Sequence, residues 1–349
     1  MARSGNFNVS YRQEIAIFRT LGQKLWLGLL GVILLAYPLL FGEYYVYIIN
    51  FALIAIIAAL GLNLLTGYTG QISLGHAAFL AVGAYTTAIF SSMGLPFILV
   101  LLLSALTSLI LGLIIGFPSL RLEGLYLAIA TMAFYFIVAY VIAHWTDMTG
   151  GQYGLKVAPL RVLGLPIDSN TRFYYLLVTF VVASVYFATN LARSRVGRAF
   201  VAIRDRDIAA EVMGIDVARY KLISFAVSSA YAGMAGSLYA YFVGILAPEH
   251  FGFDVSIQYI AMIIAGGLGS IEGAIIGALF ISLLPEGLRF VTGALASSFP
   301  ELSSNFLLLK EGVYGLIIVL FLIIEPTGIY GIWRRIKDSW DTFPYKYRG

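Results

Sequence analysis

Residues 44–65 read YYVYIINFALIAIIAALGLNLL and carry no charged side chain. The apolar core of a bilayer needs a helix of about 20 apolar residues, so this run is long enough to cross a membrane. Runs of the same kind recur along the chain and predict an all-α, polytopic membrane helix bundle with about ten crossings. Their approximate bounds are 25–42, 44–65, 72–91, 95–116, 124–143, 172–190, 220–244, 255–268, 271–290 and 305–324.

The composition agrees with a membrane protein. Of the 349 residues, 60% are hydrophobic and 11% are charged, whereas a soluble domain has about 25% charged residues. The net charge of +4 can indicate nucleic-acid binding, but the basic residues lie between the apolar runs, where they orient the helices. We therefore predict no nucleic-acid partner. The chain has no cysteine, which excludes disulfides and cysteine metal sites.

The positions of the basic residues predict that both termini are cytoplasmic. Seventeen of the 22 lysines and arginines fall on one face: four before residue 25, Arg121, seven within 193–221 and five after residue 324. Lysine and arginine are enriched in cytoplasmic loops. The first apolar run has no evident cleavage site and is expected to be a retained helix.

These bounds divide the chain into a transmembrane domain and two tails. The sequence predicts a cytoplasmic N-terminal tail over 1–24, the transmembrane domain over 25–324 and a cytoplasmic C-terminal tail over 325–349. Within the domain, 191–219 is a cytoplasmic loop and 144–171 is an extracytoplasmic loop. The glycines and prolines of the outer loop favour irregular structure with a short hairpin or surface helix. That loop is either a plain connector or a landing site for an outer partner.

Small residues recur at helical spacing in the runs 220–244 and 271–290. Helices in a bilayer associate by close packing through such residues, so the pattern predicts a tight bundle.

Two glycine-rich breaks interrupt the apolar pattern. Residues 67–72 and 266–271 share the pattern G-x-x-G-x-I at an offset of 199 residues. Paired interruptions mark the binding region of some duplicated transporters, although a match between low-diversity stretches also arises by chance. Irregular backbone at membrane depth is tolerated where protein or a wet cavity covers it. The candidate residues of a translocation path are therefore Asn63, Gly70, Gln71, Ser73, His76, Thr131, Gly267 and Gly269.

Alternative assignments stay open for the polar members of this set. Bonding between helices explains Asn63, Gln71, Ser73 and Thr131 equally well, and a histidine bonded to a backbone carbonyl is the better explanation of His76. The apolar runs contain no paired carboxylates or histidine cluster, so the sequence predicts no catalytic residue and no metal site. No phosphate-binding loop of the Walker type is present, and a pump built on this chain takes its energy from another subunit.

The loop 193–221 reads RSRVGRAFVAIRDRDIAAEVMGIDVARYK and carries seven basic residues. Residues 207–213 are typical of a short helix, with Asp205 or Asp207 at its start and Gly214 at its end. Ile208, Glu211, Val212 and Ile215 follow helical spacing and form one face. A short helix of this kind fits a groove on another subunit, and the alternative is a segment that rests on lipid headgroups.

Four segments resemble the LivM-type permease subunits of branched-chain amino-acid ABC transporters. They are GLNLLTGYTGQISLGHAAFLAVGAY (61–85), LEGLYLAIATMAF (122–134), GRAFVAIRDRDIAAEVMGIDVARYKLISFAVSSAYAGMAGSLYA (197–240) and IAGGLGSIEGAIIGALF (264–280). Urea and short-chain-amide permeases share the pattern.

The resemblance implies an ABC importer permease in the cell (inner) membrane. The implied partners are two cytoplasmic ATPases, a second permease of the LivH type in a heterodimer, an extracytoplasmic binding protein and membrane lipid. No cofactor is implied in this chain, because ATP and Mg²⁺ belong to the ATPases. The coupling helix that engages an ATPase is implied at 205–215. The implied coupling residues are Arg204, Asp205, Asp207, Ile208, Glu211, Val212, Gly214 and Ile215.

We therefore expect a transporter subunit rather than an enzyme, with branched-chain or related amino acids as cargo. Urea or a short-chain amide is the alternative cargo. A channel for a small neutral solute is a further alternative, but it leaves the charged loop 193–221 without a role.

Overall fold

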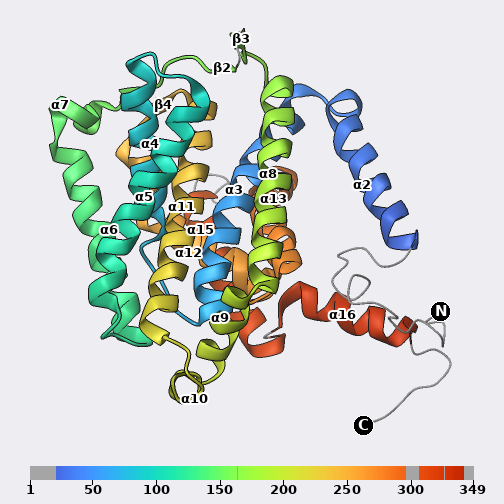
Figure 1. Cartoon of the computed structure of the whole chain (residues 1–349). Helices are drawn as coiled ribbons and strands as arrows, with labels where there is room; N and C mark the ends of the chain where they lie inside the picture. Colours follow the sequence, from blue (N-terminus) through green and yellow to red (C-terminus); the bar gives the residue numbers. More distant parts are fainter. Residues whose placement is uncertain (1–20, 163, 296–305, 326, 342–349) are drawn as a thin grey trace.

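The computed structural model describes residues 21–162, 164–295, 306–325 and 327–341, which are almost entirely helical (Figure 1). The helices are α2 (Leu21–Leu40), α3 (Glu43–Leu62), the π-helix η1 (Asn63–Tyr68), α4 (His76–Ser92), α5 (Phe97–Ser119), α6 (Leu125–His144), α7 (Thr146–Thr149), the 3₁₀-helix η2 (Gly151–Tyr153), α8 (Asn170–Arg193), α9 (Arg195–Asp205), α10 (Asp207–Val212), α11 (Val217–Val243), the 3₁₀-helix η3 (Pro248–Phe251), α12 (Phe253–Gly266), α13 (Ile271–Leu295), α15 (Phe306–Ile324) and α16 (Gly328–Asp341). The strands are β1 (Leu155–Lys156), β2 (Arg161–Val162), β3 (Leu165–Pro166) and β4 (Ile245–Leu246).

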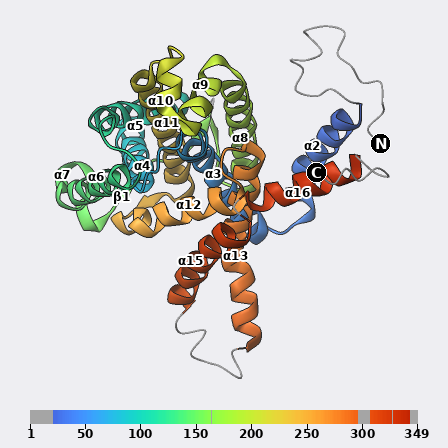
Figure 2. The ribbon, with the colours of Figure 1, turned by 90° about the horizontal axis from the view of Figure 1, so that it is seen from below.

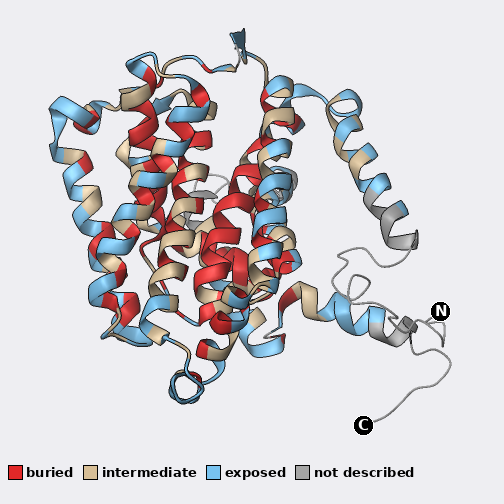
Figure 3. Ribbon diagram, viewed as in Figure 1, coloured by how far each residue is buried: buried red, intermediate tan, exposed pale blue. Residues whose placement is uncertain are grey.

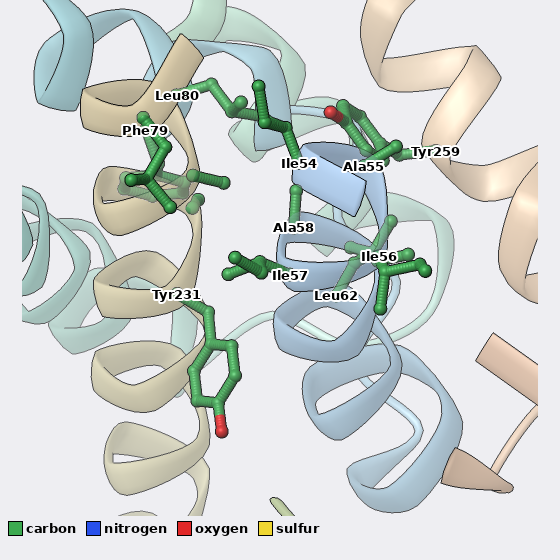
Figure 4. Packing of buried hydrophobic residues seen from close by; sticks show 14 of the residues in the cluster. Ile54, Ala55, Ile56, Ile57, Ala58, Leu62, Phe79, Leu80, Tyr231 and Tyr259 are labelled. Carbon is green, nitrogen blue, oxygen red and sulfur yellow. The ribbon is translucent and has the colours of Figure 1, made fainter. Parts of the chain in front are cut away.

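Helix α3 lies inside the bundle, where α8, α11 and α13 pack directly against it and α12 contacts it, while α4 and α5 pack on α11 (Figures 1 and 3). A helix that is apolar on all sides is stable only when it is buried, and α3 has buried residues on every face of its second half. Figure 4 shows Ile57 of α3 pointing toward α11, the helix that carries Tyr231. In contrast, α5, α6 and α8 expose large apolar side chains on their outer faces, as expected where a helix meets lipid.

The small residues of α11 allow neighbouring helices to approach closely, as the sequence predicts. A methyl group at Gly83 of α4 would overlap the backbone of Gly233 in α11. On α5, Ser108 lies against Gly233 and its hydroxyl donates to Phe79 O at 3.0 Å. The glycines of α13 pack in the same way on α12, since a methyl group at Gly277 would overlap the backbone of Met262.

Six helices among the described residues are long and apolar enough to cross a membrane. They are Glu43–Tyr68, Phe97–Ser119, Leu125–His144, Asn170–Arg193, Val217–Val243 and Ile271–Phe290. A seventh candidate is the pair Leu309–Ile324 and Gly328–Lys337, which bends by 42°. All ten predicted runs contain a helix, but α4 has 17 residues and α12 has 14. Figure 2 shows α13 and α15 projecting beyond the rest of the bundle.

Three local expectations need correction. The predicted run 72–91 includes four residues that are not helical, because α4 begins only at His76. The predicted run 255–268 overshoots α12, which ends at Gly266. The π-helix η1, which continues α3, has no counterpart in the prediction.

The loop 144–171 forms the end of the bundle opposite α10 (Figure 1). It contains the short helix α7 and the β2–β3 hairpin, in which Arg161 pairs with Pro166. These elements agree with the predicted hairpin or surface helix. The loop is also tied to the end of α11 by an antiparallel pair, β1–β4, with Leu155 opposite Leu246.

Candidate functional site

The first glycine break begins where α3 widens into η1. A π-helix is rare and often lies at a functional site. In an α-helix, Gln71 N would donate to Gly67 O. Here Gln71 N donates to Leu65 O instead, at 3.2 Å, so Gly67 O does not receive its usual helical hydrogen bond. Gly70 follows with φ +76°, a left-handed conformation that glycine adopts without steric cost. The chain is then non-helical until α4 begins.

The second glycine break lies between α12 and α13. Gly267 and Gly269 have φ of +126° and +74°, values that favour glycine. Ser270 then caps α13, because its hydroxyl oxygen accepts from Gly273 N at 3.0 Å.

The fold brings the two breaks together, and Asn63 joins them. Its Nδ2 donates to Ser270 O at 2.7 Å, and its Oδ1 accepts from Gly269 N at 3.0 Å. Asn63 is only 1% exposed. A methyl group at Gly67 would overlap both Asn63 Oδ1 and Gly269 N, so only glycine allows this approach. We call this contact the break junction: Asn63, Gly67, Gly269 and Ser270.

Arg204, in the last turn of α9, reaches the break junction from the charged loop. Its Nη1 donates to Gly67 O at 2.9 Å, while Nε and Nη2 donate to Asp205 Oδ1 at 3.2 and 3.1 Å. The Arg204 side chain also lies over Gly70. Of the predicted site residues, the structure therefore brings Asn63, Gly70 and Gly269 together with Arg204.

Three other predicted path residues make hydrogen bonds around the first break. Gln71 Nε2 donates to Ser224 Oγ at 2.6 Å and to Lys221 O at 3.3 Å, both in α11. Thr131 Oγ1, in α6, accepts from Leu74 N at 2.9 Å. Ser73 Oγ accepts from Gly75 N at 3.4 Å. All three side chains are buried, and they hold the non-helical segment in place.

The two remaining predicted path residues, His76 and Gly267, have other neighbours. His76 Nε2 lies 3.0 Å from Ala58 O, and the ring is buried. This is the contact to a backbone carbonyl that the sequence analysis favours. Gly267 lies against Thr327, just before α16, and against Tyr330 in the first turn of α16.

The predicted short helix of the charged loop is present as α10, at one end of the bundle (Figure 1). Ile215 N donates to Ala210 O at 3.0 Å, and Gly214 N donates to Glu211 O at 2.9 Å. These two bonds form a Schellman motif, which requires the left-handed Gly214 with φ +83°. The end of α10 is therefore fixed by its own backbone.

Two details of the loop differ from the prediction. The N-cap position of α10 is Arg206, whose side chain makes no capping bond; Asp207 Oδ1 instead accepts from Ile208 N at 2.8 Å. Ile215 lies beyond the end of α10 and is only half-buried, so it does not extend the predicted face.

The exposed surface of α10 is largely apolar. Ile208, Val212 and Met213 are 76%, 83% and 82% exposed, and Glu211 is exposed beside them. Ala210 is buried against the bundle. We call the surface formed by Ile208, Glu211, Val212 and Met213 the knob face.

An ion cluster holds α10 against the bundle. Lys221 Nζ lies 3.0 Å from Glu123 Oε1 and 3.7 Å from Asp207 Oδ2, and the Lys221 side chain is only 11% exposed. The pKa of Asp207 lies below its ordinary value, chiefly because of a hydrogen bond with the Glu123 side chain and further because Ile208 N donates to it and Lys221 lies close.

Two hollows flank this ion cluster. The larger has a volume of about 240 Å³, and its wall includes Gly70, Gln71 and Arg204. The smaller, of about 190 Å³, lies beside Ile208 and Glu211. Both are lined by Glu123, Asp207 and Lys221.

Sequence reasoning missed four polar residues of this site, Glu123, Lys221, Ser224 and Ser270, and it did not list Gly67 or Met213 among the site residues. Each of the four polar residues lies next to a predicted motif. The local sequence does not indicate their hydrogen-bond or ion-pair partners, which are 98 to 207 residues away. Within the described residues, no three histidine, aspartate or glutamate side chains are grouped to hold a metal ion.

The chain is similar in sequence to permeases of one transport family. Residues 44–339 match the family model described as "Branched-chain amino acid transport system / permease component". The high-affinity branched-chain amino acid transport system permease protein LivM of Salmonella typhimurium is 35% identical over 335 residues, which cover 89% of this chain and 75% of the relative. LivM of Escherichia coli (strain K12) is 34% identical with the same coverage.

The second permease type of these systems is more distant. LivH of Salmonella typhimurium is 28% identical over 199 residues, which cover 54% of this chain and 60% of that protein. No solved structure shows significant similarity to the chain.

The family match extends over the break junction, α10 and every helix from α3 to α15. It makes the chain a multi-pass membrane permease and not itself an enzyme, as the sequence predicts. The chain belongs to the family of permease components of branched-chain amino acid ABC transport systems.

Proposed function

We propose that this chain is the LivM-type half of an importer that carries branched-chain amino acids into the cell. Two cytoplasmic ATPases supply the energy, a LivH-type permease completes a heterodimer, and an extracytoplasmic binding protein delivers the solute. ATP and Mg²⁺ are bound by the ATPases. In this arrangement α10 is the coupling helix, and 1–24, 191–219 and 325–349 are cytoplasmic.

The knob face is the observation that carries the proposal. Ile208 and Val212 of α10, and Met213 at its C-cap, are each more than three-quarters exposed. Exposing these apolar side chains to water is unfavourable. Burying them in a partner stabilises the complex by about 25 cal/mol for each Å² of apolar surface. The Schellman motif and the ion cluster present the face in one fixed orientation, which suits a helix that transmits force.

We further propose ten crossings, which place both termini on the α10 side. The two helices that are shortest for a span, α4 and α12, each adjoin a glycine break. A helix of 17 residues is about 26 Å long and one of 14 residues about 21 Å. The non-helical segments beside them supply the remaining depth, and the surrounding helices cover their backbone.

The topology is testable in this chain because it has no native cysteine. Tyr153→Cys and Met213→Cys form a matched pair, since the two positions are 96% and 82% exposed and follow α7 and α10, which lie at opposite ends of the bundle. An impermeant maleimide is expected to label Tyr153→Cys in cells with a permeable outer membrane, and Met213→Cys only after the inner membrane is opened. Labelling of both from the outside would refute the proposed orientation.

The partners are tested by co-purification and reconstitution. The tagged chain is expected to retain its ATPases, and the reconstituted complex to import leucine only with ATP and a binding protein. Val212→Asp is expected to abolish retention of the ATPases, while Tyr153→Asp at the opposite end leaves it unchanged. Competition by urea rather than leucine would change the proposed cargo, and solute flux without ATP would indicate a channel.

A further inference from the structure

The charged loop and the break junction are connected by a single side chain. Arg204 is the last residue but one of α9, and α10 begins three residues later. Its guanidinium reaches Gly67 O in the π-helix, 137 positions earlier in the chain. Gly67 in turn contacts Gly269, whose amide donates to Asn63. A movement of α9 therefore acts on both breaks through two or three contacts.

We propose that Arg204 and Asn63 are positioning residues for transport, which tie the coupling loop to both glycine breaks. This inference rests on the proposed function of α10. In the state described here, Arg204 holds Gly67 and Asn63 holds Gly269, so the two breaks are closed against each other. Displacement of α9 and α10 by the ATPases withdraws the guanidinium from Gly67 O and separates the breaks.

The backbone around the break junction is suited to such a change. The carbonyl of Gly67 is not used by Gln71 N, which bonds to Leu65 O instead, so Arg204 supplies a donor that the helix does not. Gly70 and Gly269 have positive φ, and a few residues at the ends of helices commonly absorb the dihedral changes of a hinge. By contrast, the surrounding helices are close-packed and resist gradual deformation.

The helix α10, which carries the knob face, is connected to α9 rigidly enough for its movement to displace Arg204. Phe200 and Ile203 of α9 are buried, which fixes the helix as a body. Lys221 holds Asp207 and Glu123 together at the start of α10. Asp205 accepts two bonds from the same guanidinium that reaches Gly67 O. Because a planar guanidinium makes these bonds at once and an ammonium does not, lysine is a poor substitute at position 204.

The matched control is Arg198 in the same helix. Its Nη1 also donates to a backbone carbonyl, at 3.2 Å, but that carbonyl belongs to Arg193 of its own loop. Arg204→Lys and Arg198→Lys are thus the same substitution at the same kind of bond, and they differ in whether the bond reaches the break junction.

The experiment compares these two variants in the full reconstituted complex. We measure retention of the ATPases, ATP hydrolysis and leucine import, and express coupling as leucine transported per ATP hydrolysed. For Arg204→Lys we expect retention and hydrolysis within about twofold of the unchanged protein, and coupling reduced about tenfold, because a hydrogen bond from a charged group is lost. For Arg198→Lys we expect no change beyond twofold.

A thiol probe reports on the break itself. Thr69 is 3% exposed and adjoins η1, and Thr69→Cys is the only thiol in an otherwise cysteine-free chain. Its rate of modification by a polar maleimide is expected to rise when ATP is added, and Arg204→Lys is expected to raise it at least threefold without ATP.

The outcomes separate this inference from the proposed function. If the unchanged chain does not bind the ATPases, the proposed function is wrong. Normal ATPase binding with unchanged coupling and unchanged Thr69→Cys labelling in Arg204→Lys overturns the positioning role alone. An equal loss of coupling in Arg198→Lys also overturns it, because the break junction is then not the cause.

Discussion

The break junction makes a quantitative prediction for Asn63→Ala. The substitution removes the acceptor of Gly269 N, which is then buried without a partner and costs about 1–3 kcal/mol. Ser270 O loses the bond from Asn63 but keeps the one from Ala274 N at 3.1 Å, a loss of about 0.5–1.5 kcal/mol. We therefore expect a destabilisation of about 2–4 kcal/mol.

Asn50, in the helix α3 that η1 continues, provides the control. It is also fully buried, but it makes one hydrogen bond, from Nδ2 to Asn170 O at 3.1 Å. Its Oδ1 has no hydrogen-bond partner among the described residues. Asn50→Ala thus loses one bond and removes an unsatisfied oxygen, so we expect a destabilisation of about 1 kcal/mol or less.

The assay heats the detergent-solubilised complex and measures by size-exclusion chromatography the fraction that remains monodisperse. At about 2 °C per kcal/mol for a large domain, Asn63→Ala is expected to lower the apparent melting temperature by about 4–8 °C, and Asn50→Ala by about 2 °C or less. If the shift for Asn63→Ala is no larger than that for Asn50→Ala, the two breaks are not held together by Asn63.

Three further predictions concern other parts of the molecule. Gly83→Ala is expected to lower the same melting temperature by about 2–6 °C, because overpacking costs about 1–3 kcal/mol. Gly315→Ala is the control and is expected to leave the melting temperature unchanged, because a methyl group there meets no neighbouring atom within 4 Å. Equal shifts for the two variants would contradict the close packing of α4 on α11. Gly214→Val is expected to uncouple hydrolysis from import while the chain still inserts, because a β-branched residue resists φ +83°; normal coupling would show that the end of α10 does not matter. Because the pKa of Asp207 is lowered in the folded protein, its stabilising effect is fully present above its ordinary value of 3.8 and is lost as the pH falls through the lowered value. The stability difference between the unchanged protein and Asp207→Asn is therefore expected to be constant above about pH 5 and to shrink on acidification; a difference that grows at low pH would contradict the ion cluster.

Local patterns account for what the sequence predicts correctly. Apolar runs of membrane-spanning length locate each long helix to within a few residues, since lipid favours helical backbone regardless of neighbours. The short helix α10 and its end at Gly214 follow from residues within one turn. The glycine patterns at 67–72 and 266–271 identify both breaks, although they do not show that the breaks meet.

Contacts between distant residues account for what was missed. In the π-helix η1, Gly67 packs closely against Gly269, and no local pattern in NLLTGY distinguishes η1 from a continued α-helix. The partners of Lys221 and Gln71 likewise depend on where α6 and α11 lie.

From its residues alone, therefore, this chain is determined to be a helical membrane protein with a charged loop and two glycine breaks, and its resemblance to a known family adds that it is a permease. Length, hydropathy and turn chemistry are properties of neighbouring residues, and they need no knowledge of packing. Only the tertiary structure joins the two breaks through Asn63 and connects them to the loop through Arg204. Those bonds form between groups that helix packing brings together from 137 to 207 positions apart, and the free energy of each depends on burial that no single segment has by itself.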